Sequence, residues 1–309
     1  MNIVLKVGGS RASWWKQHLS TLLSEATVYL ANEEMNRDDI DYAVVWKPEP
    51  GWLRTFENLK CIVSIGAGID HVLCDPELPV HLPIIRTTSP DLKVRMREYV
   101  ILHVLRLHRR LPEIVAAQSA REWRQIIEPP AHKRRVGIMG LGNLGADCAV
   151  TLATIGFDVA GWARSEKTID RVACFAGEAT RNAFLARSDI LVCMLPLTPE
   201  TEGILNADLF DRLPDGAAVI NVARGQHLVD EDLLAALNRG KVCGATLDVF
   251  HVEPLPIDHA FWDHPNVLVT PHIASLIDPI AGGERIAENI KKFDAGELIA
   301  DLVPQGRGY

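Results

Sequence analysis

The chain has 309 residues, of which 48% are hydrophobic and 23% charged, which is the composition of a globular protein. This length exceeds that of one ordinary domain and predicts two. The formal net charge of −8 argues against a nucleic-acid-binding protein, which normally carries a basic face. No apolar run approaches the roughly 20 residues that a membrane-spanning helix needs, so we expect no membrane partner.

The N-terminus and the cysteines indicate the compartment. The chain starts directly with a strand-like run and lacks the basic segment and cleavage site of a secretory signal. No two cysteines form a C-x-x-C pair, and most lie inside apolar runs, as buried reduced thiols do. We therefore expect a cytoplasmic protein. The cysteines are Cys61, Cys74, Cys148, Cys174, Cys193 and Cys243.

Strand-like runs alternate with helical patterns along the first hundred residues, which indicates parallel α/β architecture. An amphipathic stretch at Ser13–Ser24 predicts a helix between the first two strands. The predicted strands are Ile3–Val7, Thr27–Leu30, Tyr42–Trp46, Cys61–Ile65 and Ile84–Arg86.

A long helical pattern follows, from about Glu98 to Ala117. Pro112 lies inside it and predicts a kink or a break, because proline cannot donate the helical hydrogen bond. A polar stretch with Pro129 and Pro130 then separates this helix from the next strand.

The second series of strands is more uniformly apolar, which predicts strands covered by helices on both faces. Six strands with their crossovers match one complete dinucleotide-binding domain. A last helix, at about Ile280–Leu298, is expected to cross back to the N-terminal domain. The six strands are Val136–Met139, Asp158–Trp162, Ile190–Leu195, Ala217–Val222, Ala245–Val249 and Val267–Thr270.

We therefore predict the α/β class, with two doubly wound parallel-sheet domains. Residues 99–279 form a dinucleotide-binding domain with the Rossmann arrangement. Residues 1–98 together with 280–309 form a smaller, flavodoxin-like domain for the substrate.

A glycine fingerprint, G-x-G-x-x-G, lies between the first strand of the second series and the helix after it. Gly140 allows the tight turn, Gly142 the close approach of a pyrophosphate, and Gly145 the packing of helix on strand. The amides of Asn143 and Leu144 then point at the phosphates from the helix N-terminus. The alternative is a glycine-rich turn without a ligand.

The end of the next strand distinguishes NADP from NAD. NAD-specific sites place an acidic residue there for the ribose 2′-hydroxyl, but the corresponding residue is Ala163. Arg164 follows directly, and a guanidinium can bind a 2′-phosphate through two charge-assisted hydrogen bonds. Asp158 lies too early in the strand. We predict NADP, with an exposed loop arginine as the alternative.

Three reactive residues follow the last three predicted strands: Arg224, Glu253 and His272. Ligands of doubly wound sheets bind beyond the carboxyl ends of the strands, where these residues are expected to meet. Alternatively, Arg224 and Glu253 form a structural ion pair and His272 is a buried, satisfied histidine. The spacing of the nearby histidines matches no metal-binding pattern, so we predict no metal site.

These segments resemble the D-isomer-specific 2-hydroxyacid dehydrogenase family over nearly the whole chain. Within it, Trp46, the pair Trp162 and Arg164, and the terminal Arg307–Tyr309 resemble the glyoxylate/hydroxypyruvate reductase branch. The family's markers here are the glycine fingerprint and Gly66–His71, Leu195–Thr201, Asn221–Gly225, Leu247–Phe250, Glu253–Leu255 and Thr270–His272.

The resemblance implies a role for each catalytic residue. Arg224 holds the substrate carboxylate or polarises the 2-oxo group. His272, as imidazolium, donates a proton to the carbonyl oxygen as hydride reaches the carbon. Glu253 fixes the orientation of the imidazole and favours its protonated form.

The resemblance also implies contacts with substrate and cofactor. The amides of Ala67 and Gly68 hold the substrate carboxylate, although a tight turn explains Gly66–Gly68 as well. Trp46 either lines the substrate pocket or belongs to the core. Further cofactor contacts are expected from Ser165, Pro196, Val222, Ala223 and Asp248, the last of them at the nicotinamide carboxamide.

The implied activity is NADPH-dependent reduction of glyoxylate or hydroxypyruvate to glycolate or D-glycerate. Two alternatives remain open: a dehydrogenase for lactate or larger 2-oxo acids, NAD-linked or not, and a non-catalytic nucleotide-sensing interaction protein. In the similar family, the region from Glu98 through Trp123 builds a dimer, so we expect a homodimer.

Overall fold

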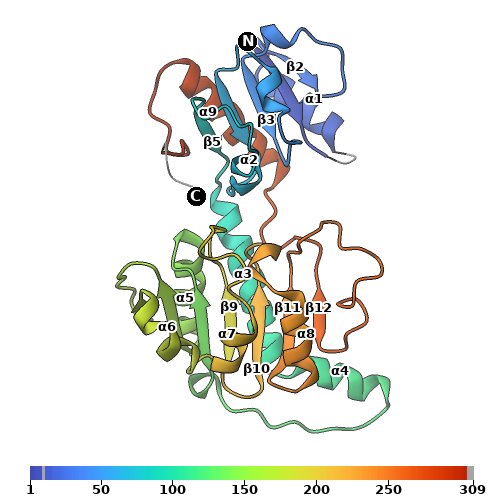
Figure 1. Ribbon diagram of the computed structural model, residues 1–309, viewed down its shortest axis with the longest axis vertical. Helices are drawn as coiled ribbons and strands as arrows, with labels where there is room; N and C mark the ends of the chain where they lie inside the picture. Colours follow the sequence, from blue (N-terminus) through green and yellow to red (C-terminus); the bar gives the residue numbers. More distant parts are fainter. Residues whose placement is uncertain (9–10, 305–309) are drawn as a thin grey trace. The chain divides into compact units, whose positions relative to one another are not determined.

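The computed structural model describes residues 1–8 and 11–304. The chain divides into two compact units (Figure 1). The first unit holds Met1–Leu92 and the segment that begins at Ile277, and the second holds Lys93–Leu276. The predicted boundaries, after residues 98 and 279, lie a few residues further along the chain. Arg307–Tyr309, which pointed to the reductase branch, lie outside the described residues.

The first unit contains, within the described part of the chain, a five-stranded sheet in the order β2-β1-β3-β4-β5. All neighbouring strands are parallel. This order is the flavodoxin-like one. The five strands predicted from the sequence are confirmed, with ends that differ by at most one residue. They are β1 (Asn2–Lys6), β2 (Thr27–Leu30), β3 (Tyr42–Val45), β4 (Cys61–Ser64) and β5 (Ile84–Arg86).

Helices α1 (Ala12–Leu22) and α9 (Pro279–Asp294) pack on one face of this sheet, through side chains such as Trp15 and Ile286. Asp278 caps α9 by accepting the amides of Ile280 and Ala281, which explains why the helix begins there. The other face is covered by α2 (Asp70–Leu73), by the short 3-10 helix η2 (Leu53–Thr55) and by Ile40, which directly follows the 3-10 helix η1 (Arg37–Asp39).

The second unit contains a seven-stranded parallel sheet in the order β12-β11-β10-β9-β6-β7-β8, counted over the described residues. The chain leaves β6 toward β7 and then returns to β9 on its other side. This change of direction is the switch point at which ligands of doubly wound sheets bind. The strands are β6 (Arg135–Met139), β7 (Asp158–Ala163), β8 (Ala173–Ala176), β9 (Ile190–Cys193), β10 (Ala217–Asn221), β11 (Val242–Leu247) and β12 (Val267–Val269).

Helices cover both faces of this sheet, so the predicted fold class is confirmed (Figure 1). Helices α6, α7 and α8 share one apolar cluster with the strands, and α3 and α5 share another. The helices of this unit are α3 (Pro90–His108), α4 (Leu111–Ser119), α5 (Asn143–Ile155), α6 (Glu178–Leu185), α7 (Ala207–Arg212), α8 (Asp230–Asn238) and the 3-10 helices η3 (Ala131–Lys133) and η4 (Gly225–His227).

Among these elements, the predicted number of strands and the predicted start of the long helix were wrong, whereas the predicted break near Pro112 is confirmed. The sequence predicted six strands for this domain and missed β8, a four-residue edge strand with one exposed and three half-buried residues. The predicted helix from Glu98 to Ala117 is two helices, and the first begins at Pro90. The break lies before Pro112, at Arg110, whose φ of 50° is left-handed. Pro112 stands in the first turn of α4, where its missing N–H costs no hydrogen bond.

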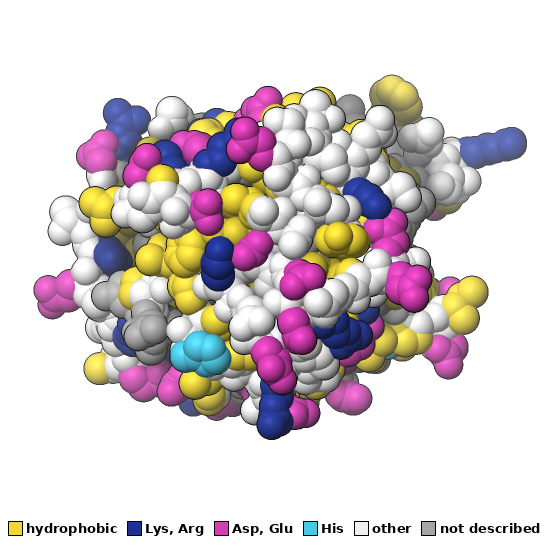
Figure 2. Space-filling view, turned by 90° about the horizontal axis from the view of Figure 1, so that it is seen from above, with side chains coloured by type: hydrophobic (Ala, Val, Ile, Leu, Met, Phe, Trp, Pro, Cys, Tyr) yellow, Lys and Arg dark blue, Asp and Glu magenta, His cyan; other side chains and the backbone are white. Residues whose placement is uncertain are grey.

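The six cysteines are all free thiols, but only half of them are buried as the sequence indicated. Burial raises the pKa of Cys61, Cys148 and Cys193 to about 12. Cys74 and Cys243 are exposed. Among the described residues, no helix combines the length and the apolar character needed to cross a membrane. Figure 2 shows one face of the molecule, on which acidic and basic side chains are interspersed.

Candidate active site

The glycine turn joins β6 to α5 and has the geometry that a dinucleotide requires. Gly140 has a φ of +104°, and its amide donates to the carbonyl of Trp162 on β7 at 2.9 Å. A Cβ on Gly145 would lie 1.9 Å from the carbonyl oxygen of Gly140, so only glycine fits there. A Cβ on Gly142, the N-cap of α5, would meet nothing within 4 Å. Open space therefore lies in front of this helix end, as a bound pyrophosphate requires.

Arg164 and Ser165 follow the end of β7 and are exposed. Trp162 anchors this end, because its indole N–H donates to the carbonyl of Gly177 at 2.9 Å. Asp158 begins β7 and pairs with Arg187 at 2.6 Å, so it lies at the opposite end of the strand. The residues present at the carboxyl end of β7 fit a 2′-phosphate better than a bare ribose hydroxyl.

Arg224 stands on a loop that its neighbours fix from three directions. Asn221, the last residue of β10, donates to the carbonyl of Arg224 at 3.0 Å and accepts the amide of Ala223 at 3.1 Å. The amide of Arg224 donates to Nδ1 of His227 at 3.1 Å. The Nε2–H of His227 is then the donor to the carbonyl of Pro196, 3.2 Å away. The sequence analysis did not single out His227, which lies beyond the motif that carries Arg224.

His272 and Glu253 form a direct pair, with 2.9 Å between Nδ1 and Oε2. The other oxygen of Glu253 accepts the amide of Phe250 at 3.1 Å, so the carboxylate is held at both ends. The side chains of His272 and Glu253 are 30% and 18% exposed, which leaves the imidazole accessible to a ligand. A carboxylate at Nδ1 makes that nitrogen the donor and directs Nε2 to the opposite side of the ring.

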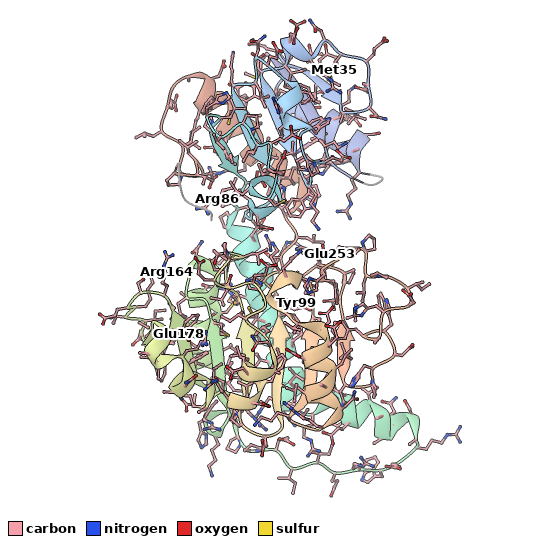
Figure 3. The ribbon with its side chains drawn as sticks, viewed as in Figure 1. Met35, Arg86, Tyr99, Arg164, Glu178 and Glu253 are labelled. Carbon is pink, nitrogen blue, oxygen red and sulfur yellow. The ribbon has the colours of Figure 1, made fainter. Side chains whose placement is uncertain are left out.

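The loops that carry these three residues meet at one edge of the sheet. Strands β10, β11 and β12 are parallel neighbours, so their carboxyl ends lie together. A Cβ on Gly225 would lie 1.9 Å from the main chain of Phe250, which shows that the Arg224 loop packs against the Glu253 loop. In Figure 3, Arg164 and Glu253 both lie at this edge of the second unit.

Asp248 is buried, and both of its carboxylate oxygens accept hydrogen bonds. Oδ1 accepts from the Thr270 hydroxyl at 2.6 Å and the Ile273 amide at 2.8 Å, and Oδ2 accepts from the Ala274 amide at 2.8 Å. Burial raises the pKa of Asp248 against the opposing effect of these donors. A nicotinamide contact from Asp248 stays a prediction, and Oδ2 has the capacity for one more donor.

The predicted substrate-binding residues of the first unit lie at the carboxyl ends of β3 and β4. The hydroxyl of Ser64 is 3.0 Å from the carbonyl of Gly66, and the amide of Thr87 donates to the same carbonyl at 3.2 Å. Because a trans peptide directs its N–H opposite to its C=O, the amide of Ala67 points away from Ser64. A contact of this amide with a substrate carboxylate stays a prediction.

Trp46 follows β3 and packs closely on this turn. A Cβ on Gly66 would lie 2.6 Å from the indole ring of Trp46. The ring is half-buried, and its centroid is 4.4 Å from that of His71. His71 accepts the amide of Lys47 at Nδ1, 3.2 Å away, and lies 3.0 Å from the Ser64 hydroxyl through Nε2. His71 therefore orders this turn, a role that the sequence analysis missed.

Two of the histidines that follow β11 face one carboxylate. Asp230, at the start of α8, lies 3.3 Å from Nε2 of His259 and 3.8 Å from Nε2 of His251. Within the described ranges, no group of three or more His, Cys, Asp or Glu side chains is arranged to hold a metal ion.

Comparisons with known proteins agree with this geometry. Residues 101–274 match the NAD binding domain of the D-isomer specific 2-hydroxyacid dehydrogenases. The chain is 41% identical over its full length, and the full length of the relative, to glyoxylate/hydroxypyruvate reductase A of Yersinia enterocolitica. It is 40% identical, with a TM-score of 0.91, to a D-isomer specific 2-hydroxyacid dehydrogenase from Xanthobacter autotrophicus Py2 in complex with NADPH and MES, over 100% of this chain and 99% of that one.

A second solved structure is that of the NADPH-dependent glyoxylate/hydroxypyruvate reductase from Sinorhizobium meliloti in complex with NADP and sulfate. It is 37% identical with a TM-score of 0.90, over 100% of this chain and 99% of that one. The full-length identity and the matched domain together establish the family. This chain belongs to the D-isomer specific 2-hydroxyacid dehydrogenases.

Proposed function

We propose that this protein is an NADPH-dependent reductase of small 2-oxo acids, with glyoxylate and hydroxypyruvate as its substrates. The observation that carries the proposal is the pair of His272 and Glu253, 2.9 Å apart on loops beside the one that bears Arg224. A proton donor, the carboxylate that orients it and a fixed cation are the groups that reduction of a 2-oxo acid requires. The full-length relatives named above have this activity in their names.

The cofactor proposed for this site is NADPH. The pyrophosphate would bind in front of α5, at the amides of Asn143 and Leu144, where Gly142 leaves open space. The 2′-phosphate would bind Arg164 and Ser165 at the end of β7. The remaining contacts that we propose are Pro196, Val222, Ala223 and Asp248.

In the proposed reaction, Arg224 binds the carboxylate of the 2-oxo acid or polarises its carbonyl oxygen. On the first unit, the amides of Ala67 and Gly68 and the side chain of Trp46 are the groups that we propose for substrate binding. When bound, NADPH would supply the hydride for the carbonyl carbon. As the C=O π bond opens, Nε2 of His272 gives its proton to the oxygen and the 2-hydroxy acid forms.

Glu253 stabilises the step in two ways. Its carboxylate offsets the positive charge of the imidazolium before transfer, and its bond to Nδ1 keeps Nε2 directed at the substrate. The bond from the Phe250 amide holds the carboxylate in place, so little reorganisation is needed when the proton leaves.

A panel of 2-oxo acids tests this function. NADPH oxidation is followed by absorbance with glyoxylate, hydroxypyruvate, pyruvate and a branched 2-oxo acid, and each assay is repeated with NADH. We expect the highest kcat/KM with glyoxylate or hydroxypyruvate and NADPH. One methylene changes binding by only about 1–3 kcal/mol, so pyruvate should be a measurable but poorer substrate. Absence of NADPH oxidation with all four acids would refute the proposal.

We propose a homodimer as the working form. Helix α4 and the segment after it expose large apolar side chains, among them Trp123, which is 94% exposed, and Ile127, which is 95% exposed. Contiguous exposed apolar residues of this kind mark protein interfaces. On α4 itself, the exposed large apolar side chains are those of Leu111, Ile114 and Val115.

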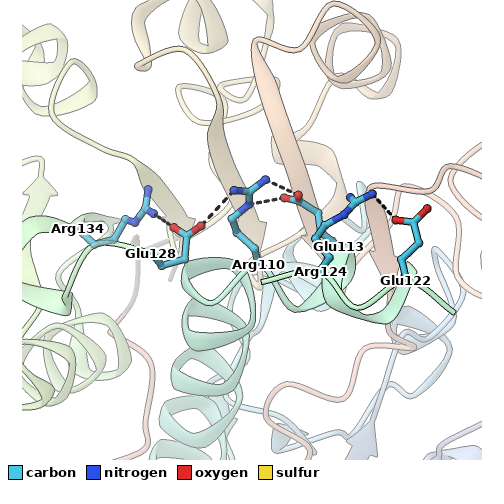
Figure 4. Close-up of polar contacts among 6 residues, drawn as sticks. All are labelled: Arg110, Glu113, Glu122, Arg124, Glu128 and Arg134. Carbon is cyan, nitrogen blue, oxygen red and sulfur yellow. Dashed lines mark hydrogen bonds and ion pairs between the residues drawn. The ribbon is translucent and has the colours of Figure 1, made fainter. Parts of the chain in front are cut away.

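Ion pairs connect the residues of this segment with one another and with the start of the second sheet's first strand (Figure 4). Arg110 pairs with Glu113 and Glu128, and Arg134 binds the second oxygen of Glu128 at 2.9 Å. Light scattering should give the mass of a dimer, and the double change Trp123→Ser and Ile127→Ser should give a monomer. A wild-type monomer at micromolar concentration would contradict the dimer.

We infer a cytoplasmic location from the six free thiols, because an oxidising compartment favours disulfides. Cell fractionation with an antibody to the protein tests this inference.

A further inference from the structure

A chain of hydrogen bonds connects helix α3 with the loops of the active site. The hydroxyl of Tyr99 on α3 is 2.6 Å from Oγ1 of Thr270, and Thr270 donates to Oδ1 of Asp248 at 2.6 Å. An ionised carboxylate only accepts, so the single hydroxyl proton of Thr270 goes to Asp248. Oγ1 of Thr270 must then accept from Tyr99, and the direction of both bonds is fixed.

Asp248 in turn binds three successive amides of the turn that carries His272. The amide of His272 donates to the main-chain carbonyl of Asp248, that of Ile273 to Oδ1 and that of Ala274 to Oδ2, each at 2.8 Å. His272 has a φ of +54°, a left-handed conformation that is unfavourable for a residue with a side chain. Such a conformation persists only where the surroundings hold it, and here Asp248 does so.

The surroundings of Tyr99 explain why its hydroxyl depends on this chain. Tyr99 is 9% exposed and belongs to an apolar cluster with Val100 and Val104, and its ring centroid is 4.2 Å from that of His103. A hydroxyl in such surroundings needs a hydrogen-bond partner. Burial raises the pKa of Tyr99, so the hydroxyl keeps its proton and remains a donor across the neutral range.

We propose that Tyr99 is a positioning residue for the proton donor: through Thr270 and Asp248, its hydroxyl holds the turn on which His272 meets Glu253. The proposal rests on the proposed function, in which His272 protonates the substrate. Tyr99 itself touches neither the reacting atoms nor His272 among the contacts described. It acts at the far end of a hydrogen-bonded network in which each member fixes the next.

The test compares variants that remove one link at a time. Tyr99→Phe removes the first donor and keeps the ring, Thr270→Val removes the middle link, and Thr270→Ser restores its hydroxyl. Tyr42→Phe is the matched control, because the buried Tyr42 hydroxyl donates to Asp294 in the first unit at 3.0 Å. It deletes the same atom from a core without touching the turn that carries His272.

We expect Tyr99→Phe to lower kcat by roughly 10-fold and Thr270→Val by roughly 10- to 100-fold, since small misplacements of a catalytic group have effects of this size. The KM for NADPH should stay within about twofold, because the phosphate-binding turn is untouched. Thr270→Ser should recover most of the activity, and Tyr42→Phe should keep all of it. The double variant Tyr99→Phe with Thr270→Val should be no slower than Thr270→Val alone.

The acid limb of the pH profile gives a second readout. Loss of the Thr270 donor raises the pKa of the Asp248 carboxylate. In Thr270→Val, the acid limb of kcat that reflects protonation of Asp248 should therefore move to higher pH. Asp248 is faced by His272 on the neighbouring turn and by Tyr99 on α3, with Arg106 beyond Tyr99 on the same helix. We expect a smaller shift of the acid limb in Tyr99→Phe and no shift in Tyr42→Phe.

Amide hydrogen exchange separates this proposal from the proposed function, because it needs no turnover. The amides of Ile273 and Ala274 should exchange faster in Tyr99→Phe and Thr270→Val than in wild type. Their exchange rates should be unchanged in Tyr42→Phe. If the wild type fails to reduce 2-oxo acids while these amides respond, the proposed function fails and the network stands. Three results would each overturn the positioning role. In Tyr99→Phe, these are an unchanged exchange rate with an unchanged kcat, or a faster exchange with an unchanged kcat. The third is an additive loss of activity in the double variant.

Discussion

Glu253 accepts a hydrogen bond from Nδ1 of His272 at 2.9 Å. The same carboxylate accepts the amide of Phe250 at 3.1 Å through its other oxygen. Both oxygens of Glu253 therefore face N–H donors. A side chain that places a donor at either position would replace one of these hydrogen bonds with a repulsive contact between two donors.

Glu253→Gln should lower kcat by about 10²-fold or more, the lower range of what positioned proton transfer contributes. The glutamine amide can accept only one of the two bonds, so it loses either the imidazole or the Phe250 amide. Steady-state kinetics with glyoxylate measures this, and the KM for NADPH should change little. A variant with wild-type kcat would show that the pair does not act in proton transfer.

Gly142→Ala and Gly145→Ala should separate cofactor binding from folding. A Cβ on Gly142 meets nothing within 4 Å, so the protein should unfold at nearly the same urea concentration but bind NADPH at least about 10-fold more weakly. A Cβ on Gly145 would lie 1.9 Å from a carbonyl oxygen, so that variant should lose about 1–3 kcal/mol of unfolding free energy. Equal NADPH affinity in Gly142→Ala and wild type would place the pyrophosphate elsewhere.

Arg164→Ala should weaken the preference for NADPH over NADH by roughly 10- to 100-fold. Hydrogen bonds to charged groups contribute about 1.5–3 kcal/mol, and the alanine cannot bind a 2′-phosphate. The measurement is kcat/KM for both cofactors, and NADH serves as the internal control because it lacks that phosphate. An equal loss with both cofactors would mean that Arg164 supports the loop rather than recognising the phosphate.

The pH dependence of stability should show the pair of Asp189 and Arg135. Burial works to raise the pKa of Asp189, but donors from the side chain and amide of Arg135 outweigh it and hold the pKa below its usual value. A carboxylate whose pKa is lowered in the folded state adds to the free energy of unfolding at pH values above its unfolded-state pKa of about 3.9. This contribution is lost as the pH falls through the folded-state pKa.

Asp189→Asn should therefore cost about 2 kcal/mol of unfolding free energy at pH 7, as expected for hydrogen bonds to a charged group. As the pH falls through the folded pKa of Asp189, the wild-type carboxyl also becomes protonated, so the difference between the two proteins should shrink toward zero. Urea unfolding from pH 7 downwards measures this. A difference that is constant with pH would assign the loss to packing rather than to charge.

The strands of both sheets could be predicted from the sequence because buried parallel strands are continuous apolar runs, as Tyr42–Val45 and Ile190–Cys193 are. Strand β8 was missed although Val172–Ala176 is apolar, because so short a run does not by itself distinguish a strand from other structure, and its four strand residues are at most half-buried. The sequence does contain a start signal for α3. Ser89 followed by Pro90 is typical of a helix N-terminus, but the charged first turns hid the apolar face.

The candidate site could be predicted where a reactive residue type follows the carboxyl end of a predicted strand. Arg224, Glu253 and His272 were predicted as candidates because each follows an apolar strand, and the glycines because their spacing is specific. The residues that hold them were not found. Tyr99 and Thr270 have the appearance of ordinary helix and strand-end residues in the sequence. His71 binds the amide of Lys47, and His227 contacts the carbonyl of Pro196, both far away in the sequence. Such contacts depend on tertiary structure, which a single sequence does not display.

The central claim is that His272 donates the proton in an NADPH-dependent reduction. The most direct test measures NADPH binding by fluorescence and glyoxylate reduction by absorbance, on wild type and His272→Ala. The account predicts that the variant binds NADPH with an affinity within about twofold of wild type, while kcat falls by about 10²- to 10⁴-fold. Glyoxylate reduction at the wild-type rate in His272→Ala would contradict it.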